Sequence, residues 1–201
     1  MSISAAYATA EQYRFVTGGT DSSKDTDILI DLKAISRYID GKMHRFFTCD
    51  ADAVTRIYVP AETSSTLWVN DLSAAPTSIK VDDDGDGDFD DETALASTDY
   101  ELLPFNADKG PEPSPWMQIA LGPWGTRDSF RAGVRVQVIA CFGWPAVPEA
   151  IQRATIHLTA ILRLETPRAT RRIPELGEAI ETSWEAQKII RQLVSQYRRF
   201  I

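Results

Sequence analysis

The stretch VRVQVIACFGWPAVPEAIQRATIHL, residues 134–158, contains the change of periodicity that decides the fold class. Residues 134–140 form a short run rich in β-branched side chains and bounded by turn residues, which predicts a strand. Gly143-Trp144-Pro145 then predicts a turn, and Pro148 suits the first turn of a helix. The helix itself is indicated by an apolar stripe at helical spacing: Val147, Ile151, Ala154, Leu158 and Ile161. We expect Trp144 to be buried between the sheet and the helices.

Three more helices are predicted on either side of this junction. Thr9 and Gln12 have the spacing of a capping box, which begins a short helix that ends near Gly18. A second helix carries the stripe Ile28, Leu32, Ile35 and Ile39 and ends near Gly41 or one turn later. The last helix runs from about Ser183 to Phe200, and residues 182–185 have capping-box spacing. Its apolar stripe is Ala186, Ile190, Leu193 and Tyr197.

The middle of the chain is predicted to be β-rich. Short β-branched runs bounded by turn residues predict strands at 54–59, 67–69, 77–81, 117–121 and 134–140, and five prolines predict loop through most of 105–131. The predicted fold class is therefore α+β: a small helical bundle, made of two N-terminal and two C-terminal helices, with a β-rich insertion. We expect one domain over 1–201, with the bundle at 1–47 and 146–201 and the insertion at 48–145.

Composition places the chain among ordinary globular proteins. It has 201 residues, of which 43% are apolar and 25% charged, enough to build a core without disulfides or a structural metal. The net charge is -8, but the acidic residues are concentrated between residues 82 and 92. Two distant cysteines predict a reducing compartment, and the N-terminus resembles no signal peptide. These features predict a soluble protein made in the cytoplasm.

Catalytic motifs are not found. The two histidines, His44 and His157, lack a cysteine, serine or carboxylate at a known motif spacing, and the sequence contains no GxSxG, HExxH, Walker or GxGxxG pattern. We therefore expect a protein that is not an enzyme and needs no organic cofactor.

The acidic run DDDGDGDFD, residues 82–90, partly matches a calcium-binding loop. Its carboxylates at loop positions 1, 3, 5 and 9 fit, but position 12 is Thr93, with Glu92 one place early, and the flanks read as strands. A solvated hairpin turn is the favoured interpretation. A weak Ca²⁺ site is the alternative, with Asp82, Asp84, Asp86, Asp88 and Asp90 as its candidate ligands.

Two further groups of residues are candidates for an interface. Trp116 and Trp124 lie in the segment predicted to be loop, where neither a helix nor a strand readily buries them. Either this segment folds onto the sheet or its tryptophans contact a partner, and we favour the partner because aromatic side chains are enriched at interface cores. The last helix is cationic after Glu185. Its candidate interface residues are Lys188, Arg191, Tyr197, Arg198 and Arg199. Positive charge also stabilises a helix C-terminus, so stabilisation of the helix end is the alternative role for Arg198 and Arg199.

Five blocks of sequence resemble the head-tail connector proteins, also called adaptor or head-completion proteins, of long-tailed bacteriophages and gene transfer agents. They are YAT at 7–9, SRYID at 36–40 followed by Phe46, the acidic turn after SIKV at 78–81, TDYELLP at 98–104 and, most specific of all, FGWPAVPEAI at 142–151. The resemblance covers the chain from about Tyr7 to Leu164.

The resemblance implies a structural subunit of the virion. Such a subunit assembles as a homo-oligomeric ring, commonly of twelve copies, beneath the portal protein, and extends the DNA channel towards a tail or stopper protein. DNA would pass without sequence recognition, and no membrane would be involved. We expect the cationic last helix to face the portal or the channel. A calcium-dependent binding module that uses residues 82–90 is the alternative function.

Overall fold

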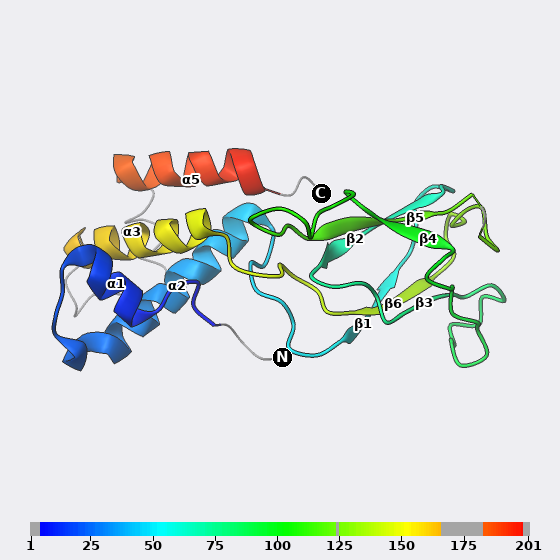
Figure 1. Ribbon diagram of the computed structural model, residues 1–201, viewed down its shortest axis with the longest axis horizontal. Coiled ribbons are helices and arrows are strands. Elements are labelled where there is room, and N and C mark those ends of the chain that lie inside the picture. The colour runs from blue at the N-terminus through cyan, green and yellow to red at the C-terminus, as the bar shows by residue number, and fades with distance from the viewer. Residues whose placement is uncertain (1–4, 124, 166–182, 199–201) are drawn as a thin grey trace. The chain divides into compact units, whose positions relative to one another are not determined.

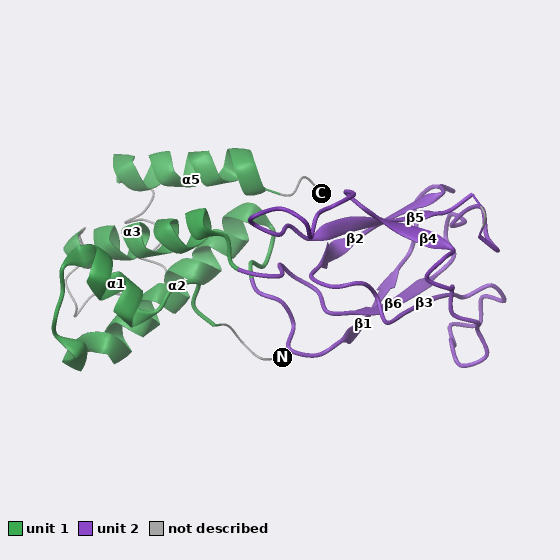
Figure 2. Ribbon diagram, in the orientation of Figure 1, with its two compact units in different colours: residues 1–47, 147–201 green, residues 48–146 purple. Residues whose placement is uncertain are grey.

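The computed structural model describes residues 5–123, 125–165 and 183–198 (Figure 1). The chain divides into two compact units, one made of residues 1–47 and 147–201 and the other of residues 48–146 (Figure 2). The first unit is helical and the second contains the β-strands. The predicted α+β class, a helical bundle with a β-rich insertion, is confirmed. Within the described residues, no helix is both long and apolar enough to cross a bilayer.

The helical unit begins with α1, Ala10–Thr17, whose limits are set by its end residues. The predicted capping box is present, because Thr9 Oγ1 accepts from the Gln12 amide and the Gln12 side chain accepts from the Thr9 amide. The helix ends at Gly18, which adopts a left-handed conformation with φ 73°. Tyr13 is the buried residue of this helix.

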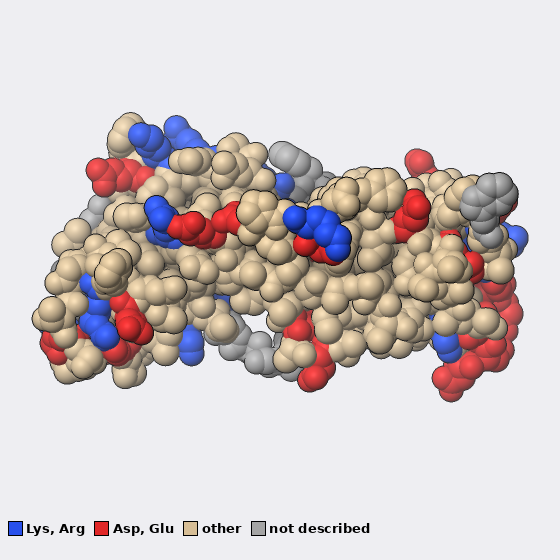
Figure 3. Space-filling view, viewed as in Figure 1, with Lys and Arg blue, Asp and Glu red and all other residues tan. Residues whose placement is uncertain are grey.

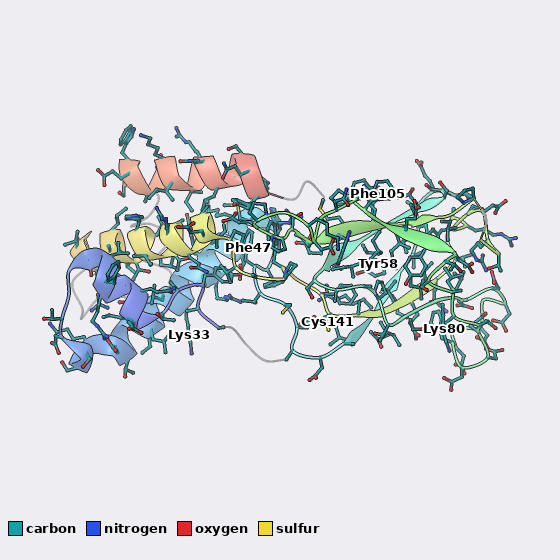
Figure 4. The ribbon with its side chains drawn as sticks, in the orientation of Figure 1. Lys33, Phe47, Tyr58, Lys80, Phe105 and Cys141 are labelled. Carbon is teal, nitrogen blue, oxygen red and sulfur yellow. The ribbon has the colours of Figure 1, made fainter. Side chains whose placement is uncertain are left out.

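The longest helix in the part of the chain that the structure describes is α2, Asp25–Met43, which follows a short 3-10 turn at Ser22–Lys24. The predicted stripe is confirmed: Ile28, Leu32, Ile35 and Ile39 are all buried. The helix continues past Gly41 until His44 takes up a left-handed conformation, and Met43 adds a further turn to the buried face. Phe47, labelled in Figure 4, is fully buried just beyond it.

Two further helices among the described residues are α3, Glu149–Glu165, and α5, Trp184–Tyr197. In α3 the Pro148 carbonyl accepts the first helical hydrogen bonds, and Ile151, Leu158 and Leu162 are buried. The N-cap of α5 is Ser183, so the predicted box at 182–185 was wrong by one residue. The helix also ends at Tyr197, short of the predicted Phe200, because Arg198 takes up an extended conformation.

The β unit contains two antiparallel three-stranded sheets. One sheet has the order β1-β6-β3, with β1 at Val54–Tyr58, β6 at Val136–Ala140 and β3 at Ser78–Val81. The other sheet has the order β2-β5-β4, with β2 at Thr66–Leu72, β5 at Trp116–Leu121 and β4 at Tyr100–Leu103. Buried side chains from both sheets form one apolar cluster, which includes Leu67, Ile79, Ile119, Val138 and Phe130. The central strand β6 alternates buried and half-buried residues, because successive side chains of a strand point to opposite faces of the sheet.

The turn after β6 depends on the residue types at positions 143 and 144. Gly143 has φ 116°, and a Cβ placed there would overlap the Thr48 carbonyl oxygen and lie 2.9 Å from Cα of Cys49. The Gly143 amide donates to the Asp71 carbonyl oxygen at 2.7 Å. Trp144 is 6% exposed and its Nε1 donates to the Asp71 carboxylate at 3.2 Å. The turn is thus held to the end of β2 by backbone and side chain together.

Candidate functional site

The acidic loop follows β3 and includes the three carboxylates of Asp82, Asp84 and Asp86, whose ligand atoms all lie within 4.8 Å of one another. They form the single metal-compatible group of His, Cys, Asp or Glu side chains in the described part of the chain. Figure 3 shows a concentration of acidic side chains over this end of the β unit. Such an arrangement can attract a cation, and it presents a strongly negative surface.

Amide groups of the loop donate hydrogen bonds to one oxygen of each of these carboxylates. Asp82 accepts from the Gly85 amide at 2.8 Å, Asp84 from the Asp86 amide at 3.2 Å, and Asp86 from the Asp88 amide at 2.7 Å. Asp88 accepts in turn from the amides of residues 89 and 90. These are successive Asx turns, in which each carboxylate fixes the backbone just after it.

Basic side chains and Glu92 complete this arrangement. Arg135 lies 3.4 Å from the buried carboxylate of Asp82, and Arg127 forms an ion pair with Asp83. Glu92, the residue one place early for a calcium loop, accepts from the Asp83 amide at 2.9 Å and so closes the loop. Glu92 thus holds the loop through the Asp83 amide, which differs from the bidentate cation ligand that position 12 supplies in a calcium loop.

Of the two candidate interface tryptophans, Trp116 lies in β5 and is half-buried against the apolar cluster of the β unit. The sequence-based placement of Trp116 in a loop was therefore wrong. Pro115 immediately before it is compatible with a strand, because a proline before the first strand residue removes no ladder hydrogen bond. Trp124 lies outside the described residues.

The candidate residues of the last helix fall into two sets. Lys188 and Arg191 are exposed on α5, and Arg198 is exposed just beyond it. Tyr197 is instead half-buried: its ring packs edge-on against Phe47, with centroids 5.6 Å apart, and its carbonyl oxygen accepts from Arg45. Tyr197 thus attaches α5 to the segment after α2. Arg199 lies outside the described residues.

Two blocks that carry the sequence resemblance meet in a buried polar cluster of the helical unit. The Tyr7 amide donates to Ser36 Oγ at 3.0 Å, and the Tyr7 hydroxyl donates to Asp40 and accepts from the Phe47 amide. Arg37 Nη1 lies 3.1 Å from the second Asp40 oxygen. Burial raises the pKa of Asp40 to about 6, opposed by the Tyr7 hydrogen bond and by Arg37. Burial beside this carboxyl also raises the pKa of Tyr7.

Sequence reasoning missed the exposed apolar surface of the helical unit. Phe15 is 89% exposed on α1 and Trp184 is 72% exposed on α5, the highest values among the phenylalanines and tryptophans that the structure describes. The exposure of Phe15 could have been inferred from the short length of α1. An eight-residue helix that buries Tyr13 turns residue 15 to the opposite side, about 200° away at 100° per residue.

Comparison with solved structures finds a similar fold. The chain is similar to a chain from the neck of an empty GTA (gene transfer agent) particle, a structure computed with C6 symmetry, with a TM-score of 0.55 and 16% sequence identity. The match covers 99% of this chain and 94% of that chain. No known family model matches the sequence, and no curated protein matches it either.

This likeness establishes a shared fold over nearly the whole of both chains. The matched region of this chain includes both the helical unit and the β unit, so the fold of the neck chain contains both as well. The fold therefore agrees with the resemblance noted in the sequence blocks at 7–9, 36–40 and 142–151.

Proposed function

We propose that this chain is a structural subunit of the neck of a tailed bacteriophage or gene transfer agent, where it acts as a head-tail connector. The observation that carries the proposal is the fold shared with a neck chain over 99% of this sequence. The resemblance of the 142–151 block to connector proteins is independent support. A structural role also accounts for exposed aromatic side chains such as Phe15 and Trp184, which suit contacts with protein neighbours.

The subunit would assemble into a closed ring beneath the portal and extend the DNA channel. A ring needs a heterologous contact, in which one face of a subunit meets a different face of the next. The gene transfer agent neck structure to which this chain is similar was computed with C6 symmetry. Six copies and twelve copies are both compatible with a six-fold arrangement. We favour twelve, which is the number that the sequence resemblance implies.

The proposed partners are the portal protein on one side of the ring and a tail or stopper protein on the other. Arg198, exposed after α5, and Arg199 are the candidates for portal contact, because guanidinium groups pair well with carboxylates. Tight phosphate contacts would oppose the sliding of DNA through a channel, so we rank DNA below the portal protein as the partner of these arginines. The acidic loop would repel DNA phosphates or contact a basic tail protein. The protein would be made in the host cytoplasm and reside at the head-tail junction of the particle.

A particle-assembly experiment tests this proposal. Removing the gene should give DNA-filled heads without tails, and the wild-type chain supplied in trans should restore complete particles. The variant Arg198→Glu with Arg199→Glu should form rings but fail to bind the portal. Lys33→Glu, a charge reversal on the exposed side of α2, is the matched control and should restore particles. Normal tails in the absence of the protein would contradict the proposal.

Charge reversal is preferable to truncation at this end of the chain. Removing residues 192–201 would delete Leu193, which is 4% exposed, and Tyr197, which packs on Phe47. A truncated chain would therefore lose part of its helical core together with its arginines. Reversing two charges leaves that packing in place.

A second candidate function is a calcium-dependent binding module, favoured by the close approach of the carboxylates of Asp82, Asp84 and Asp86. Position 12 of the loop is Thr93, and Glu92 accepts from the Asp83 amide, so we rank this function below the first. The two make different predictions for calcium, which are given in the Discussion.

A further inference from the structure

A groove of about 350 Å³ lies between α1 and α3 on the surface of the helical unit. Phe15 and Val16 line one side, and Ile156 of α3 contributes apolar surface from the core. Glu11 and Glu149 lie among its lining residues, as does Arg153, which pairs with Glu149 at 2.5 Å. The groove is therefore apolar, with a surplus of negative charge.

The exposed face of α5 has the opposite character. Its buried residues, Ala186 and Leu193, are seven positions apart and lie against the bundle. Trp184, Lys188 and Arg191 follow a different stripe at helical spacing and line one hollow on the outside of the helix. Lys188 Nζ lies 5.5 Å from the centre of the Trp184 ring. This face therefore offers a large aromatic ring flanked by positive charge, visible as the blue group over α5 in Figure 3.

We propose that these two surfaces meet between neighbouring copies: Trp184 of one copy occupies the α1–α3 groove of the next, with Lys188 and Arg191 facing Glu11 and Glu149. The proposal rests on the ring proposed above and names the contact that closes it. Phe15 and Trp184 each offer about 150–250 Å² of surface for burial. Aromatic anchors surrounded by complementary charge are typical of the residues that dominate interface energies.

The positions of the two surfaces favour a second copy of this chain as the occupant. Figure 1 shows α5 and α1 on opposite sides of α3, and the residues that line the groove lie on α1 and α3, whereas those of the cationic face lie on α5. A contact between two different faces is heterologous and can repeat around a ring, whereas a contact between identical faces ends at a dimer. The surplus charges of the two faces also have opposite signs.

Cross-linking tests the contact directly. In a chain with Cys49 and Cys141 replaced by serine, Phe15→Cys and Trp184→Cys are introduced together and treated with a short bis-maleimide. We expect a ladder of covalent oligomers that ends at the ring size. The control pair Lys33→Cys with Trp184→Cys should remain uncoupled between chains. Covalent dimers alone, or rings seen by electron microscopy without any ladder, would overturn this contact, and the second result would leave the ring itself standing.

A double-mutant cycle gives a second readout that needs no cross-linker. Phe15→Ser and Trp184→Ser change exposed side chains, so the melting temperature of each variant monomer should equal that of the wild-type monomer. Each should raise the concentration at which half of the rings dissociate by at least about tenfold, a typical effect for a central interface aromatic. Because both residues belong to one contact, the double variant should dissociate at nearly the same concentration as either single one. Fully additive effects would place the residues in separate contacts and overturn the proposal.

These outcomes separate the inference from the proposed function. A chain that stays monomeric at all concentrations, with and without the portal protein, contradicts both the contact and the ring. Rings that survive both substitutions contradict only the contact. A groove filled by another segment of the same chain would give an intramolecular cross-link, seen as a monomer whose Phe15→Cys and Trp184→Cys thiols are both blocked, and would also overturn it.

Discussion

The hydroxyl of Tyr7 donates a hydrogen bond to the buried carboxylate of Asp40, 33 residues later in the chain, and accepts one from the amide of Phe47. Phe47 in turn packs against Tyr197 at the end of α5. The polar cluster therefore connects the N-terminal segment to the end of α2, and the ring of Phe47 connects both to the last helix. This connection makes the ionisation of Asp40 relevant to the stability of the whole helical unit.

The pH dependence of stability should reveal Asp40. Its folded pKa of about 6 lies above the reference value of 3.8, so the folded state holds the proton more tightly. Stability should then fall as pH rises from about 4 to about 6 and stay level above that, with a total change on the order of 2–3 kcal/mol. Urea unfolding at pH 4, 5, 6 and 7 should show this fall in the wild type but not in Asp40→Asn.

A second variant tests the cause of that shift. The hydrogen bond from Tyr7 lowers the pKa of Asp40, so Tyr7→Phe should move the upper end of the transition to higher pH. Identical pH profiles for the wild type, Asp40→Asn and Tyr7→Phe would show that Asp40 is not the titrating group.

Gly143 should resist replacement more strongly than another glycine with positive φ. Gly143→Ala introduces a Cβ into the Thr48 carbonyl oxygen, whereas Gly133, with φ 79°, has open space around the same position. Gly133→Ala should cost about 1–2 kcal/mol from backbone conformation alone. Gly143→Ala should cost at least about 2 kcal/mol more, measured by denaturant unfolding, because overlapping atoms force the backbone to shift. Equal losses would mean that the turn after β6 relaxes freely.

Trp144 is predicted to be a stabilising residue of the β unit. Trp144→Ala removes a ring that is 6% exposed and should cost about 3–5 kcal/mol. Trp68→Ala is the matched control, since Trp68 is 63% exposed on β2, and its loss should lie within about 1 kcal/mol. Thermal unfolding followed by near-UV circular dichroism separates the two. A wild-type melting temperature in Trp144→Ala would indicate a contact residue instead of a core residue.

The acidic loop should tolerate the loss of its charges. Asparagine keeps an acceptor oxygen for the Asx turns, so Asp82→Asn, Asp84→Asn and Asp86→Asn together should lower the melting temperature by only a few degrees. Calorimetry of the wild type with millimolar Ca²⁺ should show no saturable heat. Binding that raises the melting temperature of the wild type but not of the triple variant, as ligand linkage requires, would favour the calcium module.

Much of the helical unit could be predicted from sequence because its signals are local. Capping-box spacing fixed the start of α1, and the apolar stripe of α2 at 28–39 matches its buried face. The start of α5 was less certain because Thr182 and Ser183 are both good N-caps, and only the structure identifies Ser183. Side chains with non-local partners were harder. Tyr197 reads as an interface residue until Phe47, 150 positions away in the chain, is brought against it.

The candidate interface shows the same limit. The apolar character of Phe15 and Trp184 is plain in the sequence, but exposure depends on which face the neighbouring helices cover. Trp116 gave the opposite error, because the surrounding prolines suggested a loop while pairing with β2 and β4 makes it part of a strand. Burial of a single aromatic residue is a tertiary property, and local pattern alone does not determine it.

The mass of the purified protein in solution tests the proposed ring most directly. Native mass spectrometry at micromolar concentration, alone and with the portal protein added, measures the number of copies in each assembly. The ring predicts a single closed species of twelve or six times the 22.4 kDa chain, with no open series between monomer and ring. A monomer that persists at every concentration, with and without the portal, would contradict the account.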